Sequence, residues 1–318
     1  MLHPALRKLL NPMDSGPSTP INVENFCPIA ARQAFMKEVA ELDARATTPP
    51  PDVAHKDVLI AVDDEKIRCR IYRPGSLTDT SDAPALLYLH GGGWIYGSIE
   101  SHDAICRFLA HYTPCVVFVP EYRLAPEWRF PTPLNDAYAA YKWIIEHADD
   151  HGIDGKRVAV AGDSAGGNMA FGVSTLAIRN AFNRPCFQLL AYPVCNLFAI
   201  TTSREDFRNG YWLDNIDFQI ECYVRSDTDR LDPLASIGLA RDLSQMPPTR
   251  IITAGFDPLR DEGIALGERL AAKGVQTEIV NYPSYIHGFL SLRGILPEID
   301  DVLKESSSSI SRGLRIYL

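Results

Sequence analysis

The chain contains 318 residues, of which 46% are hydrophobic and 22% are charged, and its formal net charge is −9. This balance is typical of a globular protein that is long enough to bury a full core. The acidic charge and the absence of any basic cluster in the sequence disfavour nucleic acids and anionic membranes as partners, because both are bound through basic patches.

The first 48 residues predict helices. The segment AARQAFMKEVAELDA (30–44) places Phe35, Val39 and Leu42 on one helical face. The proline-rich segment TTPPPD (47–52) then ends this unit as a stiff linker. We therefore expect an N-terminal helical part that is separate from the sheet described next.

Short apolar segments after the linker predict a β-sheet. The first two, at 57–62 and 66–74, precede the buried runs, and the second alternates apolar and charged residues, as an outer antiparallel strand does. The later runs are continuously apolar, which is typical of parallel strands buried on both faces. Helical stretches separate them, so the sequence predicts a doubly wound α/β sheet. The later strands are expected at 85–90, 115–120, 157–162, 187–193, 250–255 and 277–282, and the helices at 101–112, 134–148, 165–180 and 262–273.

One interval breaks the alternation of strands and helices. More than fifty residues between Pro193 and Arg250 contain no sheet-like run. The segment 211–226 predicts an amphipathic helix that carries Trp212 and Tyr223. Because a long insertion in a compact domain is usually functional, we expect a lid here.

The stretch VAVAGDSAGGNMAF (158–171) contains the pattern G-x-S-x-G between a predicted strand and a predicted helix. On such a turn the serine stands clear at the carboxyl end of the sheet, where the helix N-terminus favours developing negative charge. A phosphate-binding loop is disfavoured, because Asn168 and Met169 stand where that loop needs Lys and Ser or Thr. We therefore predict that Ser164 is a nucleophile.

A serine nucleophile needs a base, normally a histidine that is held by an acid. Of the eight histidines only His287 follows Ser164, in agreement with the chain order Ser, acid, His. Asp257 directly follows the predicted strand 250–255 and is the expected acid. Asp261 is the competitor, although it can instead cap the next helix or pair with Arg260.

The segment LHGGGW (89–94) follows a predicted strand and contains three consecutive glycines. Glycines let the main chain approach a substrate carbonyl closely, as an oxyanion loop requires. A dinucleotide fingerprint fails here, because Tyr96 stands where G-x-G-x-x-G needs its last glycine. We expect this loop to donate backbone N–H groups to the substrate.

The cysteines and the apolar runs bear on the location of the protein. The seven cysteines are scattered without a CxxC pair, which predicts reduced, mostly buried thiols rather than a disulfide framework or a zinc site. The N-terminal segment lacks the apolar region of a signal peptide, and no apolar run reaches the ~20 residues of a membrane helix. We expect a cytoplasmic protein without membrane insertion, which can form a homodimer through an exposed edge strand near 277–282.

Together these segments resemble the hormone-sensitive-lipase-like group of α/β-hydrolase carboxylesterases, the bacterial family IV type. The resemblance covers roughly residues 50–318, and the order and spacing of the motifs match that group. The matching motifs are HGGGW at 90–94, YRLAPE at 122–127, GDSAGG at 162–167, DPLRDE at 257–262 and HGF at 287–289.

The resemblance implies roles for individual residues. It implies Ser164 as nucleophile, His287 as general base and acid, and Asp257 as the partner that orients the histidine. The oxyanion N–H groups are expected from Gly92, Gly93 and Ala165, whereas His90 and YRLAPE are expected to brace the loops. Candidates for the substrate pocket are Trp94, Trp212 and Phe289.

The resemblance also implies a domain organisation and an activity. The expected fold is an α/β hydrolase with a mostly parallel eight-stranded sheet, helices on both faces and a helical cap. The cap is expected from residues 1–50 and 197–235, and the catalytic domain from 51–196 and 236–318. The expected activity is hydrolysis of short- to medium-chain carboxylic esters through an acyl-enzyme, with no metal or cofactor. Alternatives are an amidase or deacetylase with the same triad, and a non-catalytic small-molecule receptor, which typically lacks the histidine.

Overall fold

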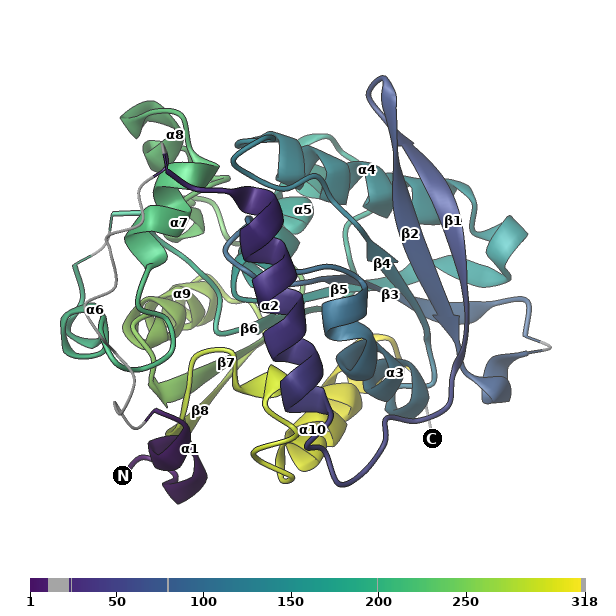
Figure 1. The fold of residues 1–318 in the computed structure, drawn as a ribbon. Coiled ribbons are helices and arrows are strands. Elements are labelled where there is room, and N and C mark those ends of the chain that lie inside the picture. Colours follow the sequence, from purple (N-terminus) through teal and green to yellow (C-terminus); the bar gives the residue numbers. More distant parts are fainter. Residues whose placement is uncertain (11–22, 24, 79, 199, 316–318) are drawn as a thin grey trace.

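The computed structural model describes residues 1–10, 23, 25–78, 80–198 and 200–315 (Figure 1). Its centre is one eight-stranded sheet in the order β1-β2-β4-β3-β5-β6-β7-β8, in which β2 runs antiparallel to both of its neighbours and all other pairs are parallel. The predicted mostly parallel sheet is thereby confirmed. The strands are β1 Ala54–Val62, β2 Glu65–Arg73, β3 Ala83–Leu89, β4 Val116–Pro120, β5 Ile153–Asp163, β6 Gln188–Ala191, β7 Thr249–Phe256 and β8 Thr277–Ile286.

Helices cover both faces of this sheet. Alternate residues of β3 belong to two different apolar clusters: Leu87 packs toward the face of α4, α5 and α9, and Leu86 toward the face of α3 and α10. A strand that is apolar on both faces is buried on both, which explains the continuous apolar runs of the sequence. These helices are α3 Asp103–Tyr112, α4 Thr132–Glu146, α5 Ala165–Arg179, α9 Arg260–Ala272 and α10 Ile299–Gly313.

The remaining helices come from the N-terminal part and from the interval between β6 and β7. They are α1 Pro4–Leu9, α2 Pro28–Asp43, α6 Thr202–Asp206, α7 Ile216–Tyr223 and α8 Asp227–Leu231. Figure 1 shows α6, α7 and α8 on the opposite side of the molecule from β1 and β2. The predicted helix 211–226 is too long. The Asp214 carboxylate accepts the N–H groups of Gly210 and Tyr211 in a turn, and only 216–223 is helical.

One arginine fastens α2 to the loops that follow β3 and β4. Arg32 forms two parallel hydrogen bonds with the Glu127 carboxylate, at 2.8 and 2.7 Å, and also donates to the carbonyl oxygens of Ile95 and Ala125. Bidentate pairs of this kind fix orientation as well as distance. The helix is therefore held directly against the loop that follows β3.

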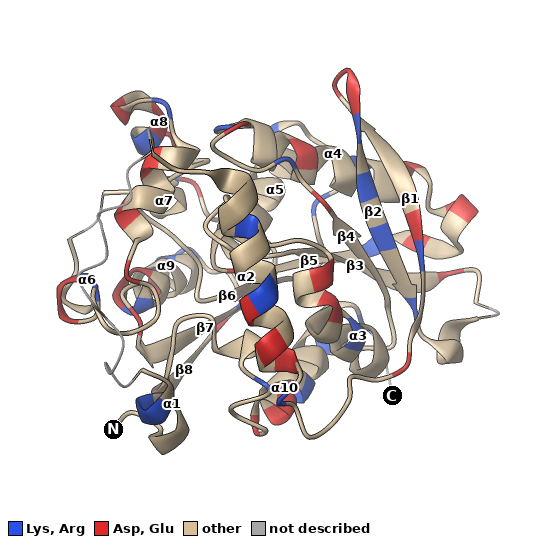
Figure 2. Cartoon of the chain, in the orientation of Figure 1, with Lys and Arg blue, Asp and Glu red and all other residues tan. Residues whose placement is uncertain are grey.

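The charged residues are interspersed rather than segregated. Figure 2 shows acidic and basic segments alternating over the visible side, including β1 and β2. On these strands Arg68 and Arg70 both pair with Asp57. Within the described residues no helix is both long and apolar enough to cross a membrane. All seven cysteines are free thiols, and all except Cys27 and Cys186 are buried.

A buried carboxyl group anchors the start of the interval between β6 and β7. Glu262 on α9 accepts the backbone N–H of Cys195 at 2.7 Å and lies 3.4 Å from the Arg204 guanidinium. Complete burial raises the pKa of Glu262 from 4.5 to about 7, and Arg204 offsets this only in part. A carboxyl group whose pKa is higher in the folded state stabilises the fold below its unfolded pKa and loses that contribution as the pH rises through the folded pKa.

We predict that Glu262→Gln removes this pH dependence. Between pH 4.5 and pH 8 the free energy of unfolding of the wild type should fall relative to the variant by roughly 3 kcal/mol. Urea denaturation of both proteins across this range measures the difference. If the free energies of unfolding of the two proteins changed in parallel with pH, the raised pKa of Glu262 would be contradicted.

Candidate active site

Ser164 lies in a strained turn between β5 and α5. Its backbone has φ +55° and ψ −119°, a combination that a non-glycine residue rarely adopts. The turn is possible because Gly166 packs against β3, where a Cβ atom would lie 2.0 Å from the carbonyl oxygen of Leu89. The sequence thus surrounds the serine with glycines so that the strand, the turn and the helix can pack this closely.

Ser164, His287 and Asp257 form a continuous hydrogen-bonded relay. The Nε2 atom of His287 lies 2.9 Å from the Ser164 hydroxyl, and its Nδ1 atom lies 2.9 Å from the Asp257 carboxylate. Asp257 is fully buried, and its other oxygen accepts the backbone N–H of Leu259 at 2.8 Å. The carboxylate is therefore held so that the imidazole presents Nε2 to the serine.

The competing acid, Asp261, takes no part in this relay. Its carboxylate accepts a hydrogen bond from Arg260 at 2.9 Å and another from the backbone N–H of Ser203 at 2.8 Å. The pKa of Asp261 is lowered, because these bonds outweigh the effect of burial. Asp261 therefore pairs with Arg260, which is the alternative role that we considered for it from the sequence.

The glycine loop after β3 approaches the serine. Gly92 has φ +114°, and a Cβ there would lie 2.5 Å from the Tyr96 carbonyl oxygen, so only glycine fits. Among the described residues, no group accepts a hydrogen bond from the N–H of Gly92, Gly93 or Ala165. These donors remain available to a substrate oxygen.

His90 is packed beneath this loop. The Tyr122 hydroxyl, from the YRLAPE segment, donates to the His90 carbonyl oxygen at 2.7 Å, and the two rings stack at 4.2 Å. Burial, together with the neighbouring His102, lowers the pKa of His90 to about 3. The ring is consequently neutral in ordinary conditions.

Asp163 and His102 form a buried pair that the sequence analysis missed. The Asp163 carboxylate accepts the Gly91 N–H at 3.0 Å and the Tyr88 hydroxyl at 2.8 Å, and it lies 3.3 Å from Nε2 of His102. Burial raises the pKa of Asp163, but His102 and Tyr88 more than offset it, so the pKa is lowered. This carboxylate, on the residue directly before Ser164, ties the glycine loop to the end of β5. An acid within the GDSAGG motif was the only signal for it.

A cavity of about 500 Å³ contains the Ser164 and His287 side chains. Apolar residues of α2 form one wall, and Trp212 and Leu213 line another part. Polar groups are also present, since the amide side chains of Asn215 and Gln219 are hydrogen-bonded to each other at 2.8 Å and both line the cavity. The sequence analysis did not identify this amide pair. The α2 lining includes Phe35, Val39 and Leu42.

The structure places two of the three expected pocket residues outside the cavity. Trp94 is fully buried and stacks on Tyr223 at 4.0 Å, beneath the interval that contains α7. Phe289 is also fully buried and packs on Tyr192 in the core. Each is the last residue of a motif, but its side chain is buried in the protein. Trp212 does line the cavity, and its indole lies beside Gly288, next to His287.

No cluster of three or more potential metal-ligating side chains occurs among the residues that the structure describes.

Comparison with known proteins identifies relatives over most of the chain. Residues 86–291 match the model of a family with the α/β hydrolase fold. The chain is 37% identical to an arylesterase of Saccharolobus solfataricus, over 81% of this chain and 84% of that protein. It is 35% identical to an ethyl acetate hydrolase of Pseudomonas putida, over 86% of each chain.

Solved structures of esterases are similar to the whole chain. An ester hydrolase from the metagenome of Lake Arreo superposes with a TM-score of 0.89 at 37% identity, covering 98% of this chain and 99% of that one. A hyperthermophilic esterase from Pyrobaculum calidifontis gives a TM-score of 0.88 at 36% identity, with 98% of each chain covered.

We predict that the two aspartates respond differently to replacement by asparagine. Asp257→Asn should lower kcat by about 10⁴, because the amide favours the wrong imidazole tautomer, as in serine proteases. Asp261→Asn is the matched control and should lower kcat far less. Steady-state kinetics with a p-nitrophenyl ester compares them, and the reverse ranking would transfer the role to Asp261.

Proposed function

The chain belongs to the α/β-hydrolase family and is a carboxylic ester hydrolase, and from this premise we propose that it is a serine carboxylesterase with Ser164 as nucleophile. The observation that carries the proposal is the buried relay from Asp257 through His287 to the Ser164 hydroxyl, which opens into a cavity. A non-catalytic small-molecule receptor would not need this arrangement. The relay therefore favours an enzyme over a receptor. The names of the relatives favour esters over amides as substrates.

Acylation follows from the positions of these groups. His287 Nε2 accepts the hydroxyl proton as Ser164 Oγ attacks the ester carbonyl carbon. The negative charge that develops on the carbonyl oxygen is stabilised by the N–H groups of Gly92, Gly93 and Ala165. When the C–O bond to the alcohol breaks, protonated His287 returns its proton to the leaving oxygen. The alcohol departs and the acyl group remains on Ser164.

Deacylation repeats these steps with water. His287 removes a proton from the attacking water, and the same backbone N–H groups stabilise the second tetrahedral intermediate. Collapse of the intermediate breaks the bond to Ser164 Oγ, which recovers the proton from His287. The acid leaves as a carboxylate at neutral pH. No metal or organic cofactor enters this scheme.

Within the family we assign the chain to the hormone-sensitive-lipase-like group, supported by the HGGGW and GDSAGG motifs. We further propose that residues 1–50 and 197–235 form a cap over a catalytic domain of residues 51–196 and 236–318. The cavity supports this division, because its apolar walls include α2 residues and Trp212. Of the other cap aromatics, Phe26 packs edge-on to Phe218, and neither lines the cavity.

We also propose a cytoplasmic location and a capacity to form homodimers. Seven free thiols suit a reducing compartment. Strand β8 lies at the edge of the sheet, and its residues are partly exposed, so it can pair with a second copy.

We predict that Ser164→Ala lowers kcat by about 10⁴ or more and abolishes the pre-steady-state burst of p-nitrophenol. The burst measures acylation, with an amplitude near one per chain in the wild type. Ser291→Ala is the matched control, because Ser291 lines the same cavity outside the relay. A normal burst in Ser164→Ala would end the assignment of the nucleophile.

We predict that kcat/KM is highest at one acyl chain length and that Trp212 helps to set this length. Each methylene that enters an apolar pocket contributes up to ~0.8 kcal/mol, and overfilling costs about 1–3 kcal/mol. Across p-nitrophenyl esters, kcat/KM should therefore peak at short to medium acyl chains, and Trp212→Ala should move the peak to longer chains. Trp128→Ala, an exposed residue outside the cavity, should leave the peak unchanged. An unmoved peak in Trp212→Ala would exclude this role.

A further inference from the structure

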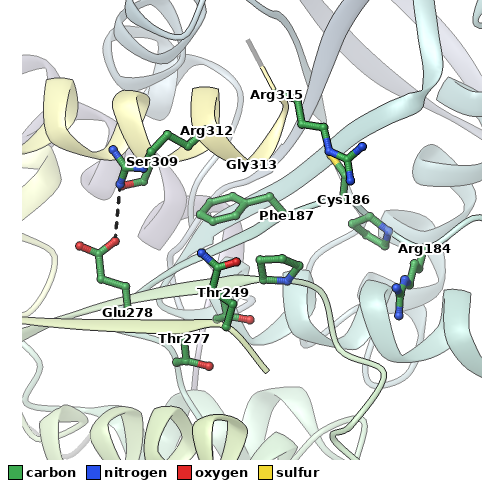
Figure 3. Close-up of a pocket in the computed structure, with 13 residues that line it drawn as sticks. Arg184, Cys186, Phe187, Thr249, Thr277, Glu278, Ser309, Arg312, Gly313 and Arg315 are labelled. Carbon is green, nitrogen blue, oxygen red and sulfur yellow. Dashed lines mark hydrogen bonds and ion pairs between the residues drawn. The ribbon is translucent and has the colours of Figure 1, made fainter. Parts of the chain in front are cut away.

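A second hollow, which we call the basic pocket, lies at the amino ends of β6, β7 and β8 (Figure 3). Its volume is about 680 Å³, larger than that of the cavity at Ser164. Because Asp257 and His287 follow the carboxyl ends of β7 and β8, the basic pocket lies at the other end of the same strands. A molecule bound there would not contact the catalytic relay.

The basic pocket carries an excess of positive charge in a protein whose net charge is −9. Arg184, Arg312 and Arg315 line it, and Glu278 is its only acidic residue among those described. The Glu278 carboxylate already accepts a hydrogen bond from Arg250 at 3.0 Å. The Arg315 side chain forms no hydrogen bond or ion pair with any other described residue, although its backbone N–H donates to the Arg312 carbonyl oxygen at 3.1 Å. Arg312 lies 3.8 Å from the Glu278 carboxylate, so among the described residues of the pocket three guanidinium groups face one carboxylate, and the Arg315 guanidinium has no acidic partner.

The middle of the basic pocket is apolar. Figure 3 shows Phe187 between Arg315 and Cys186 on one side and Glu278 and Ser309 on the other. Burial raises the pKa of the Cys186 thiol to about 11, so this side chain is neutral near pH 7. The Phe187 ring is mostly buried but lines the pocket beside the excess of guanidinium groups, an arrangement that suits an anion with a small apolar part.

We propose that the basic pocket is a second ligand site, which binds a small organic carboxylate. The carboxylate pairs with Arg312 and Arg315, whose planar guanidinium groups match its two oxygens. The apolar body of the ligand lies on Phe187. Inorganic phosphate would use the charge but leave the aromatic surface uncovered. The proposal does not depend on the catalytic roles assigned above.

Calorimetric titration of the full chain with sodium benzoate tests the site. Wild type should bind benzoate saturably, and the double variant Arg312→Gln/Arg315→Gln should raise Kd by about tenfold or more, since charged hydrogen bonds are lost. Arg225→Gln is the matched control, because Arg225 is exposed and lies outside the basic pocket. Unchanged ester hydrolysis by the double variant shows that it is folded.

Alkylation of Cys186 by N-ethylmaleimide supplies a local readout, with Cys27 as the exposed reference thiol. Benzoate should slow modification of Cys186 in the wild type, with little effect on Cys27, and should lose this protection in the double variant. Inorganic phosphate at equal ionic strength should protect weakly. Three results would overturn the proposal: equal Kd values for wild type and double variant, no saturable binding at tens of millimolar benzoate, or equal protection by phosphate.

Discussion

The close packing around Ser164 is the constraint on which the rest of the site depends. Gly166 lies against the Leu89 carbonyl, so the start of α5 and the end of β3 are fixed to each other. The glycine loop leaves β3 at that point, and Gly92 and Gly93 line the same cavity as the serine. Asp257 and His287 follow β7 and β8 at the same edge of the parallel sheet. Four segments that are distant in sequence converge because parallel strands bring their carboxyl ends to one edge.

Two buried carboxylates, those of Asp163 and Asp257, hold these segments together. They do so through different partners. Asp257 orients the imidazole through Nδ1, whereas Asp163 binds the Gly91 N–H and His102 below the loop. An isolated buried charge is costly, so each carboxylate accepts a backbone N–H besides its histidine. The site is consequently organised before the substrate arrives, which reduces the reorganisation needed in the transition state.

The sequence predicted the sheet and the relay because both depend on local patterns. Apolar runs mark buried strands, and His287 is the only histidine after Ser164. The pocket wall was harder to predict. Trp94 and Trp212 were both expected to line the pocket. Trp94 is stacked on Tyr223 in the core, whereas Trp212 borders the cavity. Which way a side chain points from an irregular loop depends on long-range packing. For the same reason, the pairing of His102 with Asp163 and the basic pocket became evident only in three dimensions.

Wall residues of the cavity such as Phe35 and Trp212 are more exposed than Ser164, His287 and Asp257. The relay and the glycine loop after β3 are held by buried contacts at the ends of core strands. Helix α2 is attached through Arg32, whose partner Glu127 is itself partly exposed. Of the residues of α2 only Leu42 is buried, so the other positions of the helix accept substitutions at small cost. Substrate size can therefore change through residues such as Phe35 and Trp212 while the arrangement of Ser164, His287 and Asp257 stays the same. This separation explains how one catalytic sheet can serve esterases that differ in the esters they accept.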